Sequence, residues 1–200
     1  MLRIGILALQ GAFIEHENLL KRLQVETFQI RQLKDLDPPF DGLILPGGES
    51  TVMGRLLQDL NLFPPLLKLI QNGLPVYGTC AGAILLAKRL TNDQHQWFQT
   101  MDITITRNAY GRQLGSFKAE AEFKGYGPTD MVFIRAPKID AIGHKVEVLS
   151  TWEGCVTACV EKNMLVTAFH PEVTENLNVH RYFVALCEAF KNQNNKGNLV

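Results

Sequence analysis

Residues 76–85 read VYGTCAGAIL, and this stretch decides the fold of the chain. Residues 75–79 (PVYGT) are typical of a buried strand, and residues 81–90 (AGAILLAKRL) have the composition and length of a helix. Between the two lies Gly-x-Cys-x-Gly, centred on Cys80. A strand, a tight glycine-flanked turn and a helix are the context of a nucleophile elbow. A glycine-rich turn with an incidental cysteine fits the same letters, so the motif alone leaves both interpretations open.

The segments before this stretch alternate between strands and helices. Apolar runs predict strands, amphipathic runs predict helices, and Ser50 is a good N-cap for the second helix. This rhythm favours a mostly parallel sheet with helices on both faces. The expected strands are residues 2–9, 25–30 and 41–48, and the expected helices are 15–23, 51–60 and 64–73.

The segments after it are rich in strands. Six runs between residues 102 and 170 alternate or are β-branched and are separated by turn residues, which predicts mostly antiparallel strands. A final amphipathic helix is expected over residues 176–190, and the polar tail 191–200 is expected to fray. No repeat or linker interrupts the chain, so residues 1–200 are predicted to form one α/β domain with a β-rich second half.

Composition excludes several classes of protein. Twenty basic and twenty acidic residues cancel, which argues against a dedicated nucleic-acid or anionic-membrane binder. No apolar run approaches the ~18 residues that span a bilayer, and the N-terminus lacks the features of a signal peptide. The four cysteines show no C-x-x-C spacing and no histidine cluster, so we expect no metal site and a reducing, cytoplasmic location.

A nucleophilic cysteine needs a base, and one of the five histidines has a suitable context. His170 ends the strand-like run MLVTAF and begins His170-Pro171-Glu172, where Pro171 keeps the backbone extended. Residues two apart in an extended segment point the same way, so Glu172 can orient the imidazole. We therefore expect Cys80, His170 and Glu172 to act as nucleophile, base and orienting carboxylate. His16 and His180 are expected on solvated or partly buried helix faces.

Two further turns fall at the same sheet edge. Residues 45–50 (LPGGES) end a buried strand, and their glycines leave N–H groups suited to an oxyanion or a substrate carboxylate. An ordinary strand-to-helix turn would also accept Gly-Gly. Gln10-Gly11 follows the first strand.

Six segments, taken in order, resemble one family: LALQGAFIEH, LILPGGEST, GTCAGAILLA, TRNAYGRQ, FIRAP and FHPE. Together they are similar to the glutaminase subunits of pyridoxal 5′-phosphate synthase, a branch of the class I (triad) glutamine amidotransferases. The resemblance runs from residue 4 to about residue 176. Other branches carry a G-x-C-L-G-x-Q elbow, whereas this chain has Ala81 and Ile84 at the Leu and Gln positions, which favours the vitamin B6 branch. Ala109-Tyr110 is a small departure from the usual pattern.

The resemblance implies a flavodoxin-like three-layer sandwich that hydrolyses L-glutamine to glutamate and ammonia through a glutamyl thioester on Cys80. It implies an oxyanion hole made by the backbones of Gly48 and Ala81 and no cofactor. By family analogy, glutamine is held by Gly48, Glu49, Ser50, Arg107, Ile134 and Arg135. Guanidinium groups also recognise a free carboxylate well, although for Arg107 and Arg135 a solvated side chain at a strand end is the plainer interpretation without the family.

The resemblance also implies a partner. Ammonia would pass to a separate (β/α)8-barrel synthase subunit, in complexes of up to twelve synthase and twelve glutaminase subunits, and docking would reorder the backbone at Gln10-Gly11. Two rival hypotheses stay open: a cysteine hydrolase or glyoxalase-like relative with the same elbow, and a non-catalytic binding subunit that keeps the fold.

Overall fold

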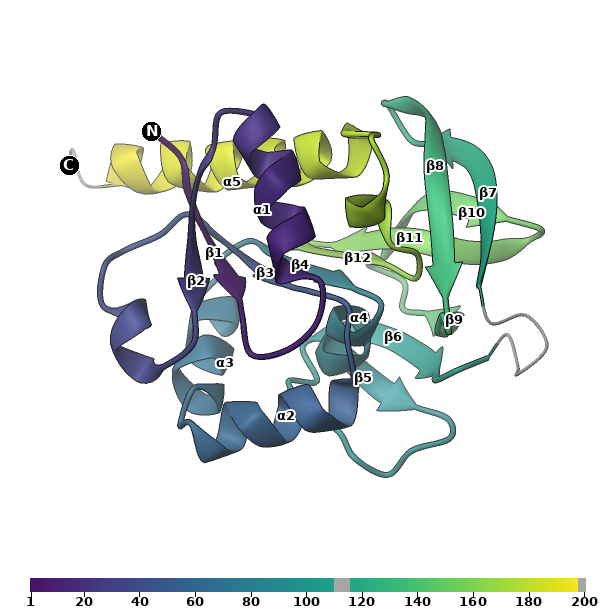
Figure 1. Cartoon of the computed structure of the whole chain (residues 1–200), viewed down its shortest axis with the longest axis horizontal. Coiled ribbons are helices and arrows are strands. Elements are labelled where there is room, and N and C mark those ends of the chain that lie inside the picture. The colour runs from purple at the N-terminus through teal and green to yellow at the C-terminus, as the bar shows by residue number, and fades with distance from the viewer. Residues whose placement is uncertain (110–115, 198–200) are drawn as a thin grey trace.

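The computed structural model describes residues 1–109 and 116–197. One sheet of ten strands passes through the whole molecule, with helices packed on both of its faces (Figure 1). A separate two-stranded sheet lies beside it. The architecture confirms the predicted α/β class with a largely parallel first half and a β-rich second half.

The parallel part of the sheet brings the site together. Its strands follow the order β2-β1-β3-β4-β12, and each neighbouring pair is parallel. Thr79 at the end of β4 pairs with Thr167 at the end of β12, so the segments that follow both strands leave the same edge of the sheet. The strands are β1 (Arg3–Leu7), β2 (Glu26–Ile30), β3 (Gly42–Leu45), β4 (Val76–Thr79) and β12 (Met164–Thr167).

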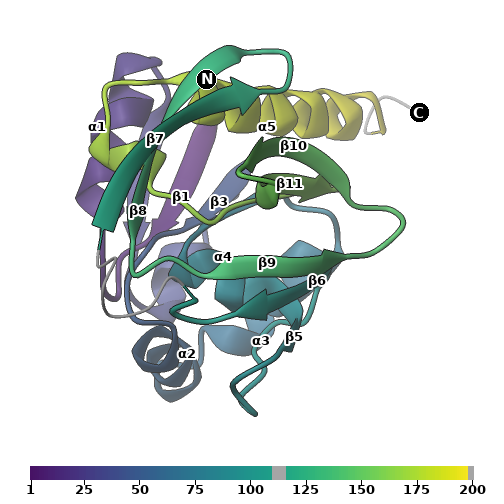
Figure 2. The same cartoon turned by 90° about the vertical axis from the view of Figure 1, so that its right-hand side faces the viewer.

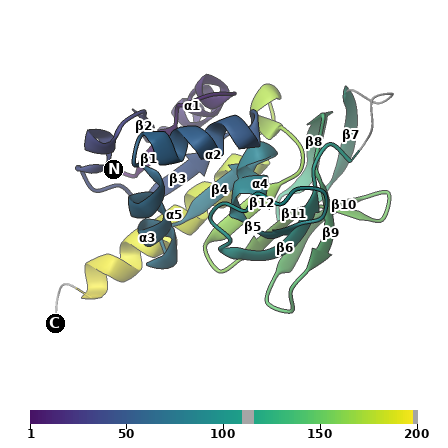
Figure 3. The ribbon, with the colours of Figure 1, turned by 90° about the horizontal axis from the view of Figure 1, so that it is seen from below.

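The helices pack on opposite faces of the sheet, through two separate clusters of buried apolar side chains. Helices α2 (Ser50–Asp59), α3 (Phe63–Gln71) and α4 (Ala81–Leu86) pack into one buried cluster, and α2 and α3 lie on the side nearest the viewer in Figure 3. Helices α1 (Phe13–Arg22) and α5 (Asn178–Gly197) pack into the other. Two helical layers with a sheet between them are the expected three-layer sandwich.

The second half extends the sheet with antiparallel strands and adds a hairpin. β11 pairs with β12, β9 and β10, and β9 pairs with β6, all antiparallel. The hairpin β7–β8 stands at one end of the molecule, where Figure 2 shows it facing the viewer. The bounds are β5 (Ala87–Leu90), β6 (Met101–Thr106), β7 (Ser116–Phe123), β8 (Gly127–Ile134), β9 (Lys138–Ile142), β10 (Glu147–Trp152) and β11 (Cys155–Glu161), with short 3-10 helices η1 (Leu33–Leu36) and η2 (Pro171–Val173).

Three local predictions are wrong. The helix expected over residues 81–90 ends at Leu86, because Ala87–Leu90 pairs with β6 as strand β5. The last helix continues past Phe190 to Gly197, so the part of the tail that the structure describes is helical. The N-cap of α2 is Glu49, not Ser50, because the Glu49 carboxylate accepts hydrogen bonds from the Thr51 and Val52 backbones.

None of the described helices combines the length and apolar character that crossing a membrane requires.

Candidate active site

Cys80 occupies a turn between strand β4 and helix α4. Its backbone has φ +49° and ψ −98°, a combination that residues with side chains rarely adopt. The flanking glycines allow the turn because a Cβ on Gly78 would come within 2.6 Å of the Gly82 carbonyl carbon, and one on Gly82 within 2.0 Å of the Leu45 oxygen. The expected strand–turn–helix arrangement is present, and it holds Cys80 in a strained conformation of the kind found at functional sites.

His170 and Glu172 meet Cys80 from the neighbouring strand β12. The His170 Nδ1 atom lies 2.7 Å from Glu172 Oε1, and both residues are buried. Burial alone would lower the pKa of His170, but Cys80 on one side and the Glu172 carboxylate on the other outweigh it and raise that pKa. The ring is therefore favoured as an imidazolium between two acidic groups.

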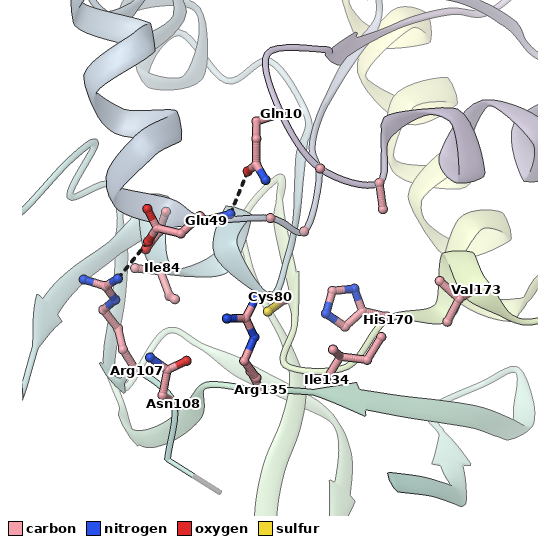
Figure 4. Close-up of a pocket in the computed structure, with 15 residues that line it drawn as sticks. Gln10, Glu49, Cys80, Ile84, Arg107, Asn108, Ile134, Arg135, His170 and Val173 are labelled. Carbon is pink, nitrogen blue, oxygen red and sulfur yellow. Dashed lines mark hydrogen bonds and ion pairs between the residues drawn. The ribbon is translucent and has the colours of Figure 1, made fainter. Parts of the chain in front are cut away.

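The contact between His170 and Cys80 is looser than the one with Glu172. Because Nδ1 faces Glu172, Nε2 is the atom available to the thiol, and Figure 4 shows the sulfur and the ring close together. Nε2 has no hydrogen-bond partner of good geometry among the described residues, although Cys80 acts on the pKa of the ring. Catalytic hydrogen bonds in free enzymes are often long and tighten when substrate binds.

Cys80 and His170 border a cavity of about 300 Å³ that is open to solvent (Figure 4). Of the residues expected at the site, all but Ala81 and Glu172 line it, and Glu172 is buried at the hydrogen-bonded side of the His170 ring. Five further lining residues were not predicted, although each is within a few positions of a predicted one. The lining consists of Gln10, Gly11, Ala12, Gly47, Gly48, Glu49, Ser50, Cys80, Ile84, Arg107, Asn108, Ile134, Arg135, His170 and Val173.

Two arginines reach the cavity in different electrostatic states. Arg107 is paired with Glu49 at 3.0 Å and with Asp93. Arg135, at φ +42°, is exposed and has no ion pair among the described residues. Of these two arginines, Arg135 has a guanidinium without an ion pair among the described residues, while Arg107 is already engaged by carboxylates of the chain.

Hydrogen bonds to Arg107 and to backbone amides keep the carboxylates of this cluster ionised. Burial alone would raise the pKa of Glu49, but the amides of Val52 and Thr51 and the charge of Arg107 lower it. Hydrogen bonds from the His95 backbone and side chain and from Arg107 lower the pKa of Asp93 to about 2, against a small opposing effect of burial. Glu49 therefore presents a fixed negative charge at the cavity wall.

The Gln10-Gly11 segment lies against the glycine-rich loop after β3. Gln10 Oε1 accepts a hydrogen bond of 2.7 Å from the Glu49 backbone (Figure 4), and the Gly47 carbonyl accepts one of 3.0 Å from the Ala12 backbone. The two segments expected at this edge are thus in direct contact. Residues 110–113 of the TRNAYGRQ motif, which include Tyr110, lie outside the described residues.

The expectation for His16 and His180 is wrong. Both side chains are fully buried, and they contact each other near Glu172. Their helices, α1 and α5, cover the same face of the sheet, a tertiary proximity that no local pattern in the sequence contains.

Among residues 1–109 and 116–197, no group of three His, Cys, Asp or Glu side chains is arranged to hold a metal ion.

Comparison with known proteins agrees with this geometry. A family model described as the SNO glutamine amidotransferase family matches residues 6–189. The chain belongs to this family. It is 52% identical over 190 residues to a protein of Haemophilus influenzae (strain PittEE) named pyridoxal 5′-phosphate synthase subunit PdxT, covering 94% of this chain and 99% of that one. It is 53% identical to the protein of the same name from Streptococcus pneumoniae (strain CGSP14), covering 94% and 98%.

Solved structures give the same result for the fold of this family member. One titled as a glutamine amidotransferase superposes with a TM-score of 0.88 at 38% identity, covering 92% of this chain and 98% of that one. A putative GMP synthase protein from Thermoplasma acidophilum superposes with a TM-score of 0.70 at 18% identity and covers 98% of each chain, which shows likeness of fold alone.

Proposed function

We propose that this chain hydrolyses L-glutamine to L-glutamate and ammonia as the glutaminase subunit of a pyridoxal 5′-phosphate synthase. Membership of a glutamine amidotransferase family and the names of its relatives support the reaction. The observation that carries the proposal is the His170 ring, held between Cys80 and Glu172 at the edge of a solvent-accessible cavity.

In the first half of the reaction, the Cys80 thiolate attacks the side-chain amide carbon of glutamine. The backbone N–H groups of Gly48 and Ala81 stabilise the resulting oxyanion. The carbon–nitrogen bond then breaks as His170 gives its Nε2 proton to the departing ammonia, which leaves a glutamyl thioester on Cys80. The raised pKa of His170 means that this proton is present at neutral pH.

In the second half, water hydrolyses the thioester. His170, now neutral, takes a proton from water through Nε2, the hydroxide attacks the thioester carbon, and the Cys80 thiolate leaves. Glutamate is released, and the thiolate–imidazolium pair is restored. Glu172 holds the Nδ1 proton of His170 throughout and keeps the ring aimed at the sulfur.

The charged groups of the cavity suit a free amino acid. Arg135 binds the α-carboxylate, and Glu49, fixed by Arg107, meets the α-ammonium group. Gly48, Ser50 and Ile134 contribute contacts around them. The substrate is then held at both ends while its amide lies against Cys80.

The ammonia is used by a partner, a (β/α)8-barrel synthase subunit, in assemblies of up to twelve copies of each subunit. Residues 1–200 act as one glutaminase domain in the cytoplasm, a compartment that suits four free cysteines. Docking of the synthase reorders the Gln10-Gly11 backbone, which in the free chain is tied to residues 47–49.

Ammonia release from glutamine, measured with and without the synthase subunit, tests the proposal. We expect slow release by the isolated chain and a large increase on adding the synthase. Full activity of the isolated chain would overturn partner activation.

Labelling of Cys80 by a diazo-ketone glutamine analogue separates a glutaminase from a general cysteine hydrolase. A glutaminase is alkylated at Cys80 and protected by glutamine. A hydrolase of other substrates shows no such protection.

A further inference from the structure

The triad has a buried side as well as a solvent side. Behind it, His16 of α1 and His180 of α5 are both fully inaccessible to solvent, and His16 Nδ1 lies 2.9 Å from His180 Nε2. Five polar side chains meet in this part of the core: His16, Tyr77, Thr79, Thr167 and His180. A buried polar cluster of this size is costly unless each group is hydrogen-bonded in a consistent direction.

One backbone carbonyl fixes that direction. The Thr167 hydroxyl donates to the Phe169 carbonyl at 3.0 Å, and a hydroxyl has only one proton to give. The Tyr77 hydroxyl, 3.0 Å from Thr167 Oγ1, must therefore donate to Thr167. The hydroxyls of Tyr77 and Thr167 thus have one fixed direction, from Tyr77 to Thr167 to the Phe169 carbonyl.

The unpartnered nitrogen of His180 sets the protons of both histidines. The buried His180 Nδ1 atom has no hydrogen-bond partner among the described residues, and an N–H there would be orphaned, which protein interiors rarely contain. A neutral His180 is therefore protonated at Nε2 and donates to His16 Nδ1. A neutral His16 that accepts at Nδ1 carries its proton on Nε2, which donates to the Thr79 hydroxyl oxygen 3.2 Å away.

The hydrogen-bond relay from His180 through His16 to Thr79 ends beside Glu172. The His16 Nε2 atom lies 3.8 Å from Glu172 Oε2, the oxygen that His170 does not use. Oε2 is buried and has no hydrogen-bond partner in the described part of the chain. The N–H that the relay assigns to His16 therefore presents its positive end to the free oxygen of the triad carboxylate.

The charge of His16 decides what this contact does. Burial, followed by the influence of His180 and His170, lowers the pKa of His16, and burial lowers the pKa of His180 to about 3. Both rings are thus neutral at physiological pH. A charged His16 would compete with His170 for Glu172, whereas a neutral donor steadies the carboxylate and leaves its charge to His170.

We propose that His16 and His180 are positioning residues for the proposed glutaminase: their neutral, one-directional hydrogen-bond relay holds Glu172 in the orientation that aims His170 at Cys80. The inference rests on the proposed function only for the role of the triad, because the relay itself is a property of the folded chain. Both rings also contact Tyr77 edge-on, with ring centroids 5.6 and 5.9 Å apart. If they served only to fill the core against Tyr77, replacing their nitrogen atoms with carbon would not affect Glu172 or Cys80.

The protonation pattern can be measured directly on the wild-type chain. Nitrogen-15 NMR of the imidazoles at pH 7 distinguishes Nδ1–H, Nε2–H and doubly protonated rings. We expect His16 and His180 both to be neutral and protonated at Nε2. An imidazolium signal from His16 or His180, or an Nδ1–H tautomer at His16, would overturn the relay without reference to any activity.

Substitutions then test whether the relay acts through Glu172. The readout is the rate at which iodoacetamide alkylates Cys80 between pH 5 and 9, measured by mass spectrometry of the peptide that contains Cys80. The thiolate is the reactive form of cysteine, and a correctly placed His170 imidazolium stabilises it. We expect His16→Leu to slow alkylation at pH 6.5 about threefold, less than for a direct hydrogen bond to a charged group, because His16 Nε2 lies 3.8 Å from the carboxylate oxygen. His16→Gln, whose amide can both donate and accept, restores most of the rate. The exposed His144→Gln is the control and leaves it unchanged.

A double variant decides between positioning and general loosening of the core. In a Glu172→Gln background, His16→Leu is expected to cause no further slowing, because its effect passes through the carboxylate that is already gone. Additive losses, or equal rates for His16→Leu and wild type, would overturn the proposal. The alkylation assay needs no glutamine turnover, so failure of the proposed glutaminase activity would appear separately, as a chain that alkylates normally but releases no ammonia.

Discussion

The two sides of the His170–Glu172 pair are built from different kinds of polar group. On the solvent side, the cavity carries full charges: Arg107, Arg135, Glu49 and the proposed thiolate of Cys80. On the buried side, the relay from His180 through His16 to Thr79 and the neighbouring hydroxyls of Tyr77 and Thr167 carry only neutral dipoles. The comparison teaches that charged side chains lie where water or substrate can screen them. In the core, where no solvent screens a charge, neutral hydrogen-bonding groups orient the carboxylate of Glu172 instead.

Removing the charge at the boundary between the two sides has the largest expected effect. Glu172→Gln keeps the shape of the side chain but removes the carboxylate that fixes the Nδ1 proton of His170, so we expect kcat for ammonia release to fall about a thousandfold. Steady-state assays with the synthase present measure it.

The matched control for that variant is Glu175→Gln, in the same segment but with a side chain 94% exposed. Its activity should equal that of the wild type. If Glu172→Gln were as active as Glu175→Gln, the carboxylate would have no part in orienting His170.

On the solvent side, Arg135→Leu separates binding from chemistry. The loss of the unpaired guanidinium is expected to raise KM for glutamine by about thirtyfold with little change in kcat, since the α-carboxylate is bound equally in the ground and transition states. Lys124→Met, which removes an exposed cation from the β7–β8 hairpin, is the control. A fall in kcat at unchanged KM would assign Arg135 to the chemical step.

On the buried side, pH should act on stability. Each neutral histidine of the relay has a pKa below the ~6.5 of an unfolded chain, that of His180 being about 3. Below pH 6.5 the unfolded state therefore binds more protons, and stability falls as pH falls, by up to about 1.4 kcal/mol per pH unit for each ring. The free energy of unfolding can be measured by urea titration at several pH values between 4.5 and 6.5. Plotted against pH, it should have a slope smaller by up to that amount in His180→Phe than in wild type. Equal slopes would mean that His180 is charged in the folded chain.

The smallest expected effect concerns Asp93, a carboxylate that acts on the substrate only through Arg107 and Glu49. Asp93 pairs with Arg107, which in turn pairs with Glu49. Asp93→Asn leaves Arg107 freer to swing from Glu49, so we expect KM for glutamine to rise about threefold with kcat unchanged. The same titration of initial rate against glutamine measures it, and a larger effect than that of Arg135→Leu would reverse the assignment of the two arginines.

The same comparison explains how much of the molecule could be predicted. The solvent side could be predicted from local motifs, since G-x-C-x-G, LPGGES and His-Pro-Glu each describe a turn at the end of a strand, and parallel strand ends meet at one edge. The relay could not, because His16 and His180 are 164 positions apart and each sits in an ordinary amphipathic helix. Only the packing of α1 and α5 on one face of the sheet brings them together.

The misplaced helix boundaries have a similar cause. Residues 87–90 have helical composition, but Arg89 pairs with Thr104 and Asp102 across the sheet, and this non-local pairing overrides the propensity of the segment. The cap of α2 depends on which side chain can reach the amides, and Glu49 reaches them while Ser50 lies inside the helix.

The central claim is that Cys80 is the nucleophile of a glutaminase, and ammonia release by Cys80→Ala in the presence of the synthase tests it most directly. We expect a loss of at least about ten-thousandfold relative to wild type, with glutamine still bound. Release of ammonia by Cys80→Ala at the wild-type rate would contradict it.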